Sequence, residues 1–167
     1  MKKRYFLSAG IATIGSIWLS DYLPNKVQGK TIKIAENHQF AIMKTEQEWR
    51  KILTPAQFEV LRQHGTERAG SSPLDLEHGN GTFACAGCNL PLFTSTTKYN
   101  SGTGWPSFYA PIEGAIGTTI DRAFAMTRTE VHCRRCGGHL GHVFADGPKP
   151  TGKRYCMNGV AMKFIAA

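Results

Sequence analysis

The stretch Gly152-Lys-Arg-Tyr-Cys-Met-Asn-Gly-Val-Ala-Met-Lys-Phe164 decides the fold of the last part of the chain. Apolar side chains recur at every second position near its end, at Val160, Met162 and Phe164. This alternation predicts a half-buried strand. If the strand is continuous, Arg154, Cys156 and Asn158 share one of its faces, because successive side chains of a strand point to opposite faces. A bulge at Gly159 would break this register.

Cys156 is the only cysteine of the chain that has no second cysteine three residues away. It lies between the cation Arg154 and the polar Asn158, a setting that suits a reactive thiol. The alternative interpretation is a buried, inert cysteine that packs like a small apolar residue. The chain has five cysteines, whereas a secreted disulfide framework favours an even number. The count therefore favours a metal site together with one free thiol.

The other cysteines form two Cys-x-x-Cys pairs, Cys85 with Cys88 and Cys133 with Cys136. Two such pairs in one small domain predict a tetrahedral Zn²⁺ site. Because all four positions would be filled, the zinc would be structural, since a catalytic zinc keeps one position open. The alternative is a pair of redox-active or disulfide-bonded motifs. Nearby histidines are predicted to be core or catalytic residues rather than ligands: His132, His139 and His142.

Length and charge bound the class of protein. The 167 residues suffice for one domain with its own core and a tail. The formal net charge is +8, and part of it sits at Lys2, Lys3 and Arg4. The remaining Lys and Arg residues are scattered and form no run that would track phosphates. We therefore expect no nucleic-acid partner.

Residues 1–23 resemble a signal peptide or membrane anchor, with a basic start and an uncharged run over residues 5–19. This run is shorter than the roughly 18 to 20 apolar residues that span a bilayer. Lys3-Arg-Tyr-Phe-Leu7 is similar to a twin-arginine export signal with lysine in the first position. We expect export to the periplasm or an equivalent compartment. Because no Ala-x-Ala cleavage site follows, the alternative is an uncleaved anchor, and membrane contact is expected through residues 1–23 alone.

Residues 24–43 are predicted to form a linker or extended arm, in which residues 30–34 alternate like a short edge strand. The domain itself is expected to span residues 44–167. It begins with two helix signals. Thr45-Glu-Gln-Glu48 is a capping box. Thr54-Pro-Ala-Gln57 repeats this signal, with proline at the first helical position.

The second helix is predicted to end at Gly65, and residues 66–80 are predicted to form a surface loop. Short strands and turns follow. The predicted strands span residues 82–85, 90–93, 123–133 and 139–144. Pro91 favours an edge position for the second of these. The predicted fold class is mainly β, antiparallel, with a short helical cap at the N-terminal side.

Several motifs occur together with the two Cys-x-x-Cys pairs. They are Gly102-Thr-Gly-Trp-Pro-Ser-Phe108, His139-Leu-Gly-His-Val-Phe144, Asp146-Gly-Pro-Lys-Pro-Thr-Gly152 and Arg154-Tyr-Cys-Met-Asn158. With these motifs the chain closely resembles the type B methionine sulfoxide reductases, over about residues 45–164. The resemblance implies two small antiparallel sheets of β-tent type, with zinc on the side away from the active site. It also implies an oxidoreductase of the oxidative stress response, which repairs oxidised proteins or peptides by reducing methionine-R-sulfoxide.

The resemblance implies a role for each residue of the reactive centre. Reduction of a sulfoxide needs a thiolate that attacks sulfur and an acid that protonates oxygen. Cys156 is the implied nucleophile, which leaves the reaction as a sulfenic acid. His142 is implied near the sulfoxide oxygen, and His139 is implied as a second histidine of the same pocket. Asn158 is expected to orient the substrate or His142.

The implied substrate pocket contains aromatic side chains. Trp105 is expected to pack its indole face on the S-methyl group, and Phe144 is a candidate for the pocket wall. Arg154 is a candidate for substrate binding and for lowering the pKa of the neighbouring thiol. The alternative for Trp105 is ordinary core packing.

The chain departs from the family pattern at Thr103. Many members have a second, resolving cysteine at this position, and no unassigned cysteine replaces it here. The expected reductant is therefore an external thiol, namely thioredoxin, a glutaredoxin with glutathione, or another small thiol. Two functions of other classes stay open from the sequence. They are a non-catalytic, zinc-ribbon-like binding module and a redox-inert structural zinc protein.

Overall fold

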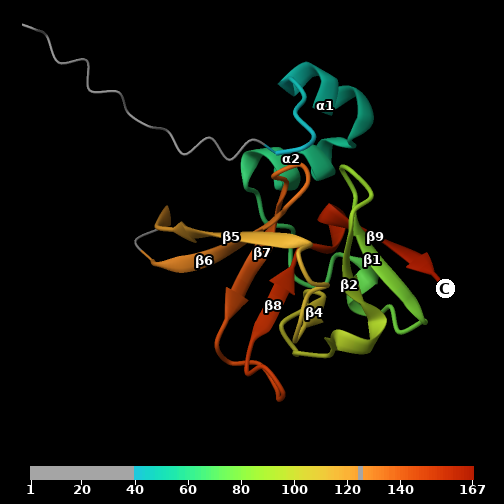
Figure 1. The fold of residues 1–167 in the computed structure, drawn as a ribbon, viewed down its shortest axis with the longest axis vertical. Helices are drawn as coiled ribbons and strands as arrows, with labels where there is room; N and C mark the ends of the chain where they lie inside the picture. The colour runs from blue at the N-terminus through green and yellow to red at the C-terminus, as the bar shows by residue number, and fades with distance from the viewer. Residues whose placement is uncertain (1–39, 124–125) are drawn as a thin grey trace, which may run out of the picture. The chain divides into compact units, whose positions relative to one another are not determined.

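The computed structural model describes residues 40–123 and 126–167 (Figure 1). The predicted signal segment 1–23 and the predicted strand at residues 30–34 lie outside the described residues, as does nearly all of the predicted arm. Within the described ranges, no helix has both the length and the apolar character needed to cross a membrane.

Two short helices open the described part of the chain, α1 (Glu46–Ile52) and α2 (Pro55–Gln63). Both predicted capping boxes are present, at Thr45 and at Thr54. Such a cap stabilises a helix by about 1 kcal/mol. The end of α2 differs from the prediction, because His64 rather than Gly65 adopts the left-handed conformation, with a φ of 57°. The Gly65 N–H then donates to the Glu59 carbonyl oxygen at 3.0 Å.

The smaller sheet has three antiparallel strands in the order β2 (Pro91–Thr94), β1 (Gly81–Cys85) and β9 (Met162–Ala166). Pro91 lies in the edge strand, as predicted. The central strand β1 pairs with β9 from Gly81 opposite Ala166 to Cys85 opposite Met162. The last strand of the domain therefore completes a sheet that begins some eighty residues earlier in the chain.

The larger sheet has six antiparallel strands. Their order is β3 (Lys98–Tyr99), β4 (Ser107–Phe108), β8 (Arg154–Met157), β7 (His139–Phe144), β6 (Arg128–Cys133) and β5 (Ile116–Asp121). The predicted strand over residues 123–133 is too long, since β6 begins at Arg128. Strand β5 was not predicted. Its middle residues are exposed at the edge of the sheet, so they carry little apolar periodicity.

The segment from Asn158 to Ala161 connects the two sheets. Strand β8 ends at Met157, a 3₁₀ turn follows (η4, Gly159–Ala161), and β9 begins in the other sheet. The strand is therefore not continuous from Arg154 to Phe164, and it is interrupted at Gly159, where the sequence left a break in register open. Gly159 is required here by close packing, because a Cβ atom at this position would collide with the side chain of Ser72.

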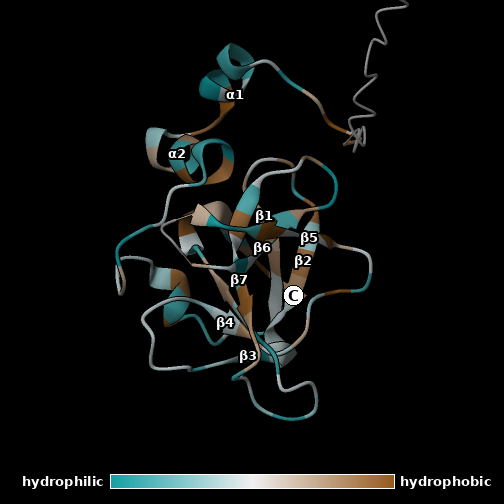
Figure 2. Cartoon of the chain, turned by 90° about the vertical axis from the view of Figure 1, so that its left-hand side faces the viewer, coloured by the Kyte–Doolittle hydropathy of each residue, from teal (hydrophilic) through white to brown (hydrophobic). Residues whose placement is uncertain are grey.

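Three fully buried phenylalanines join the sheets at the core. Phe83 and Phe93 come from the smaller sheet and Phe108 from the larger one. The Phe93 and Phe108 rings stack with centroids 4.3 Å apart, and Phe83 meets Phe108 edge-on at 4.9 Å. Such pairs contribute about 0.5–1.5 kcal/mol beyond their buried area. Figure 2 shows hydrophobic residues concentrated in the strands.

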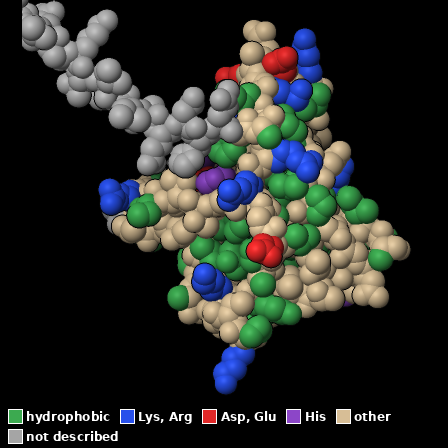
Figure 3. Space-filling view, in the orientation of Figure 1, with side chains coloured by type: hydrophobic (Ala, Val, Ile, Leu, Met, Phe, Trp, Pro, Cys, Tyr) green, Lys and Arg blue, Asp and Glu red, His purple; other side chains and the backbone are tan. Residues whose placement is uncertain are grey.

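The predicted fold class is confirmed, with two antiparallel sheets and few helices. The region expected to be a surface loop, residues 66–80, contains a short 3₁₀ turn (η1, Pro73–Asp75), and another (η2, Ser95–Thr97) precedes β3. On the face shown in Figure 3, the Lys and Arg side chains are spread over the surface.

Candidate active site and metal centre

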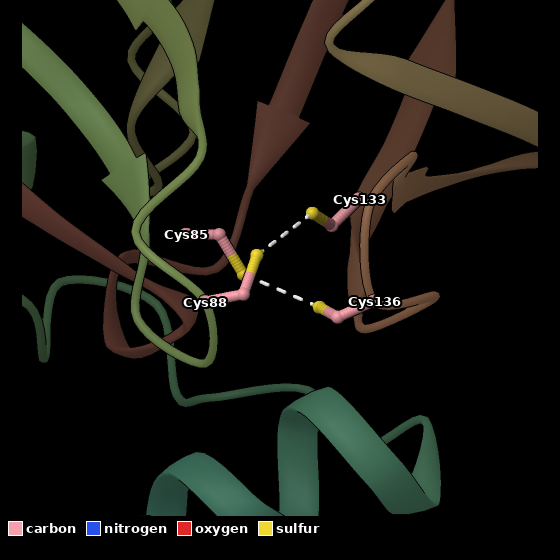
Figure 4. Close-up of side chains that lie close together, drawn as sticks. All are labelled: Cys85, Cys88, Cys133 and Cys136. Carbon is pink, nitrogen blue, oxygen red and sulfur yellow. Dashed lines mark hydrogen bonds between the residues drawn. The ribbon is translucent and has the colours of Figure 1, made fainter. Parts of the chain in front are cut away.

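The four paired cysteines converge into one cluster (Figure 4). The Cys85 and Cys136 sulfurs are 3.7 Å apart, and the Cys88 and Cys133 sulfurs are 3.5 Å apart. All four lie within 4.8 Å of one another. A tetrahedral thiolate site with metal–sulfur bonds of about 2.3 Å places its sulfurs about 3.8 Å apart. The residues therefore fit a metal ion with four thiolate ligands.

The two knuckles have the same local design. Asn89 and Gly137 each follow the second cysteine of a pair and adopt left-handed φ angles of 61° and 67°. Their N–H groups donate to the carbonyl oxygens of Cys85 and Cys133, both at 2.9 Å. Each turn brings the two thiols of a pair to the same side of the backbone. Gly137 adopts this left-handed conformation without strain, because glycine has no Cβ atom.

Cys156 lies in a row of side chains that crosses the larger sheet. It is paired with Ser107 of β4 on one side and with His142 of β7 on the other. His142 is paired in turn with Glu130 of β6. Directly paired residues of antiparallel strands share one face of the sheet. The sheet therefore places the thiol and the His142 imidazole next to each other.

A pocket of about 150 Å³ opens at this row. It is lined by Thr66, Trp105, Arg128, Gly141, His142, Phe144, Cys156 and Asn158. The structure thus brings together Cys156, His142, Asn158, Trp105 and Phe144, as predicted. None of the clustered cysteines lines this pocket. Cys156 is half-buried and reaches a cavity, which distinguishes it from a cysteine enclosed in the core.

Burial raises the pKa of the Cys156 thiol, because the thiolate loses solvation. A hydrogen bond with Thr103 and the positive charge of Arg154 oppose this shift but do not reverse it. The Thr103 Oγ1 and Cys156 Sγ atoms are 3.9 Å apart. The expected effect of Arg154 is therefore present, yet the thiol is mostly protonated near neutral pH.

His142 is held by a carboxylate that the sequence did not reveal. Its Nε2 atom lies 2.9 Å from Asp121 Oδ2. Asp121 also accepts from the Ala123 N–H at 2.8 Å and from Arg128 at 2.7 Å. The pKa of Asp121 is held well below its usual range, chiefly by the hydrogen bond from the Ala123 N–H and also by those from the His142 imidazole and Arg128. The ionised carboxylate therefore accepts a hydrogen bond from Nε2–H, and Nδ1 is the ring nitrogen that makes no bond to Asp121.

Burial lowers the pKa of His142, and Asp121 partly offsets this effect. The imidazole is therefore largely neutral at neutral pH, and its protonated form is a stronger acid than an exposed histidine. Asp121 lies on β5, the strand that was not predicted. Only the pairing of β5, β6 and β7 brings it to His142, so no sequence spacing could have indicated the contact.

His139 is placed differently from the prediction, because it does not line the Cys156 pocket. It is only 2% exposed, and its Nδ1 atom lies 2.8 Å from Glu130 Oε1. Its ring centroid is 5.4 Å from that of His142. His139 therefore packs beside the catalytic candidate and lines the neighbouring pocket instead.

The Asn158 side chain makes hydrogen bonds to backbone groups. Its Nδ2 donates to the Leu140 carbonyl at 3.1 Å, and its Oδ1 accepts from the Glu67 N–H at 2.9 Å. No hydrogen bond between Asn158 and His142 is present among the described residues. Asn158 therefore holds the wall of the pocket together and does not orient the imidazole directly.

Glu67 is a second residue that the sequence did not reveal. Its carbonyl oxygen accepts from Trp105 Nε1 at 3.1 Å. Its carboxylate accepts from the N–H groups of Gly159 and Val160 at 2.6 and 2.9 Å. These bonds fix both the indole of the pocket and the turn that follows the Cys156 strand. Glu67 lies in a segment predicted as a surface loop, where a lone acidic residue gives no signal.

Arg154 supports the pocket from outside. Its guanidinium makes two bonds to the Asp146 carboxylate, at 3.0 and 2.9 Å, and lies 4.4 Å from the Phe144 ring centroid. It does not line the Cys156 pocket. The side chain therefore positions Phe144 rather than contacting a molecule in the pocket.

Comparison with known proteins agrees with this geometry. Residues 53–166 match the model of the SelR domain. The chain belongs to the SelR domain family. It is 50% identical over 126 residues to the peptide methionine sulfoxide reductase MsrB of Leptospira interrogans, covering 75% of this chain and 96% of the relative. It is 54% identical over 127 residues to the MsrB of Methanosarcina barkeri, covering 75% and 89%.

A third SelR relative matches more of the chain. The chloroplastic peptide methionine sulfoxide reductase B1 of Arabidopsis thaliana is 46% identical over 161 residues, covering 96% of this chain and 76% of the relative. The type B resemblance recognised from the motifs is thereby confirmed. The matched SelR region contains both cysteine knuckles and the complete Cys156 pocket.

Proposed function

We propose that this chain reduces methionine-R-sulfoxide, in peptides or proteins, to methionine. The observation that carries the proposal is the pocket in which the Cys156 thiol meets the His142 imidazole and the aromatic side chains Trp105 and Phe144. The names of the SelR relatives support reduction of methionine sulfoxide in peptides, without regard to the epimer. A thiol that reaches a pocket beside an acid group and an apolar surface is the set of groups that a methyl sulfoxide requires.

The sulfoxide step begins with attack of the Cys156 thiolate on the substrate sulfur. The transient sulfur–sulfur bond and the sulfur–oxygen bond of the substrate then break as the protonated oxygen transfers to the Cys156 sulfur. Methionine leaves as a thioether, and Cys156 is oxidised to a sulfenic acid. Nδ1 of His142 is the ring nitrogen that is not bonded to Asp121. It takes the proton of the Cys156 thiol as the thiolate forms and passes this proton to the sulfoxide oxygen. Desolvation of the imidazole favours this transfer, since it makes the imidazolium a better proton donor.

Selection of the R epimer follows from the two unlike sides of the pocket. Trp105 and Phe144 offer apolar surface to the S-methyl group, whereas His142 offers a polar group to the oxygen. Only one configuration of the chiral sulfur places the methyl group on the aromatic side and the oxygen on the His142 side while the sulfur faces Cys156. In the other configuration, the oxygen would meet the aromatic surface without a hydrogen bond, which costs about 1–3 kcal/mol.

Recycling requires an external thiol. The chain has five cysteines, and four of them form the metal cluster. A first external thiol attacks the Cys156 sulfenic acid and releases water, and a second thiol reduces the mixed disulfide. Thioredoxin, a glutaredoxin with glutathione, or another small thiol would supply these electrons.

The cysteine cluster is proposed to hold one Zn²⁺ ion. Four thiolates at these separations suit zinc, which would supply folding energy and no chemistry because its coordination would be complete. For location, we propose export across the cytoplasmic membrane or a homologous internal membrane, directed by residues 1–23.

Turnover of a methionine-R-sulfoxide peptide with dithiothreitol tests the function, beside the S epimer. We expect conversion of the R epimer alone. Cys156→Ser should abolish it with the fold intact by circular dichroism, because a hydroxyl is a far weaker nucleophile than a thiolate. Turnover of neither epimer by the zinc-loaded protein, or undiminished turnover by Cys156→Ser, would refute the proposal.

A further inference from the structure

A second cluster of metal-binding side chains lies beside the active site. Glu130 Oε1 is 2.8 Å from His139 Nδ1 and 3.1 Å from His64 Nδ1. Each of the three residues offers one ligand atom, and these atoms lie within 4.8 Å of one another. The His64 and His139 rings face each other with centroids 5.1 Å apart. Two imidazoles thus converge on one carboxylate oxygen.

The backbone holds these side chains in place from three different elements. Glu130 lies on β6, and His139 opens β7. His64 ends α2 in the left-handed conformation, with a φ of 57°. Residues other than glycine rarely adopt this conformation, and asparagine and histidine tolerate it better than most. The conformation turns His64 toward Glu130.

The cluster is open to solvent on one side only. His139 and Glu130 are 2% and 11% exposed at their side chains, whereas His64 is 65% exposed. All three line a pocket of about 480 Å³, which is separate from the Cys156 pocket but shares His142, Thr66 and Arg128 with it. A metal ion could therefore enter from solvent and keep water molecules as additional ligands.

The charges around the cluster permit a cation. Arg128 lines the same pocket, but its guanidinium is paired with Asp121 at 2.7 Å. Arg122 is exposed at the pocket rim. Among the ion pairs of the described residues, the Glu130 carboxylate is paired with His64 and His139 and with no Lys or Arg side chain. The site therefore offers one carboxylate and two imidazoles.

We propose that His64, Glu130 and His139 form a second metal site. This site binds Zn²⁺ reversibly, and the ion enters from solvent. Two imidazoles and a carboxylate favour a borderline ion such as Zn²⁺ over Mg²⁺ or Ca²⁺. Zinc with ligand bonds of about 2.1 Å separates its tetrahedral ligand atoms by about 3.4 Å. The observed distances of 2.8 and 3.1 Å would need to lengthen by about 0.6 and 0.3 Å to reach this separation. Three protein ligands leave the fourth position to water, unlike the closed cysteine cluster.

The test is a calorimetric zinc titration of the full chain after it has been loaded with one zinc ion per chain. A Cys156→Ser background prevents the free thiol from binding the added metal. We expect a second equivalent to bind. His64→Asn should weaken this second binding at least about tenfold, because one of three ligands is lost. Asparagine tolerates the left-handed conformation, so the helix end should be preserved.

His78→Asn is the matched control, since it removes an exposed loop histidine outside the cluster. It should bind the second zinc as tightly as the background protein. Glu130→Gln provides a second variant and should weaken the binding as well. The proposal would be overturned if the zinc-loaded background protein bound no second zinc ion. It would also be overturned if His64→Asn bound the second ion as tightly as the background protein does. Neither result depends on sulfoxide turnover, so the test is independent of the proposed function.

Discussion

Thr103→Cys should create an intramolecular route for resolving the oxidised thiol. Thr103 Oγ1 lies 3.9 Å from Cys156 Sγ. A sulfur introduced at this position would need to move about 2 Å closer to Cys156 Sγ to reach the disulfide bond length of about 2.05 Å. The residues flanking Thr103 in its loop are Gly102 and Gly104, which permit the small shift that remains. After sulfoxide reduction, the new thiol should attack the Cys156 sulfenic acid and release water.

The resulting disulfide should also stabilise the fold measurably. The two positions are 53 residues apart in the chain. The loop-entropy relation for a closed loop of this size gives up to about 4 kcal/mol in the oxidised protein. The predicted consequence is a higher urea midpoint after one turnover, which dithiothreitol should return to the value of the reduced variant.

The assay is a single turnover without reductant, followed by mass spectrometry and dimedone trapping. The wild-type protein should yield a dimedone adduct at Cys156, whereas Thr103→Cys should yield a disulfide and no adduct. Thr119→Cys is the control, because it adds an exposed thiol on β5, three strands away from Cys156. A persistent sulfenic acid in Thr103→Cys would show that the loop does not approach the thiol as closely as the structure shows.

Four further outcomes can be measured. Cys133→Ser should remove most of the domain's stability, typically 5–15 kcal/mol, because metal-binding energy is folding energy; a stable, metal-free variant in thermal unfolding would contradict this. His142→Ala should slow sulfoxide reduction by roughly 10²–10⁴-fold, and unchanged single-turnover rates would exclude its role as the acid. Iodoacetamide labelling of Cys156 should still be rising at about pH 8.5, the ordinary pKa of a cysteine thiol, because burial raises the pKa of this thiol and the thiolate forms only as pH rises through it; a plateau below about pH 8.5 would contradict this. Residues 1–23 fused to a reporter should direct its export, and a reporter that remains cytosolic and soluble would disprove the signal.

The sequence predicted those elements whose signals are local. Both helix caps involve residues three positions apart, and the two Cys-x-x-Cys pairs fix their own turns. Pro91 excluded a central position for its strand for the same kind of reason, since it lacks a backbone donor. The Cys156 pocket was predicted through family resemblance, which relates residues that are distant in the chain.

The contacts that escaped prediction depend on strand register. In a regular strand, His139 and His142 would point to opposite faces. A bulge in β7 opposite Val131 and His132 adds one residue, which brings both histidines to the same face. Leu140 is the extra residue, which has no partner on β6. At the adjacent Gly141, a Cβ atom would collide with the Cys156 carbonyl oxygen. The position of Asp121 depends on the same sheet, so neither contact could be inferred from spacing.

The pairing of β1 with β9 has a consequence for biosynthesis. The central strand of the smaller sheet emerges from the ribosome long before its partner, Met162–Ala166, has been made. Until then, one edge of β1 has no partner, and the aromatic core beneath it cannot close. Contacts this distant in sequence slow folding and lengthen the time during which a strand edge is exposed to aggregation. Because β8 comes just before β9 in the chain, the pocket around Cys156 can assemble only after nearly all of the domain has been translated.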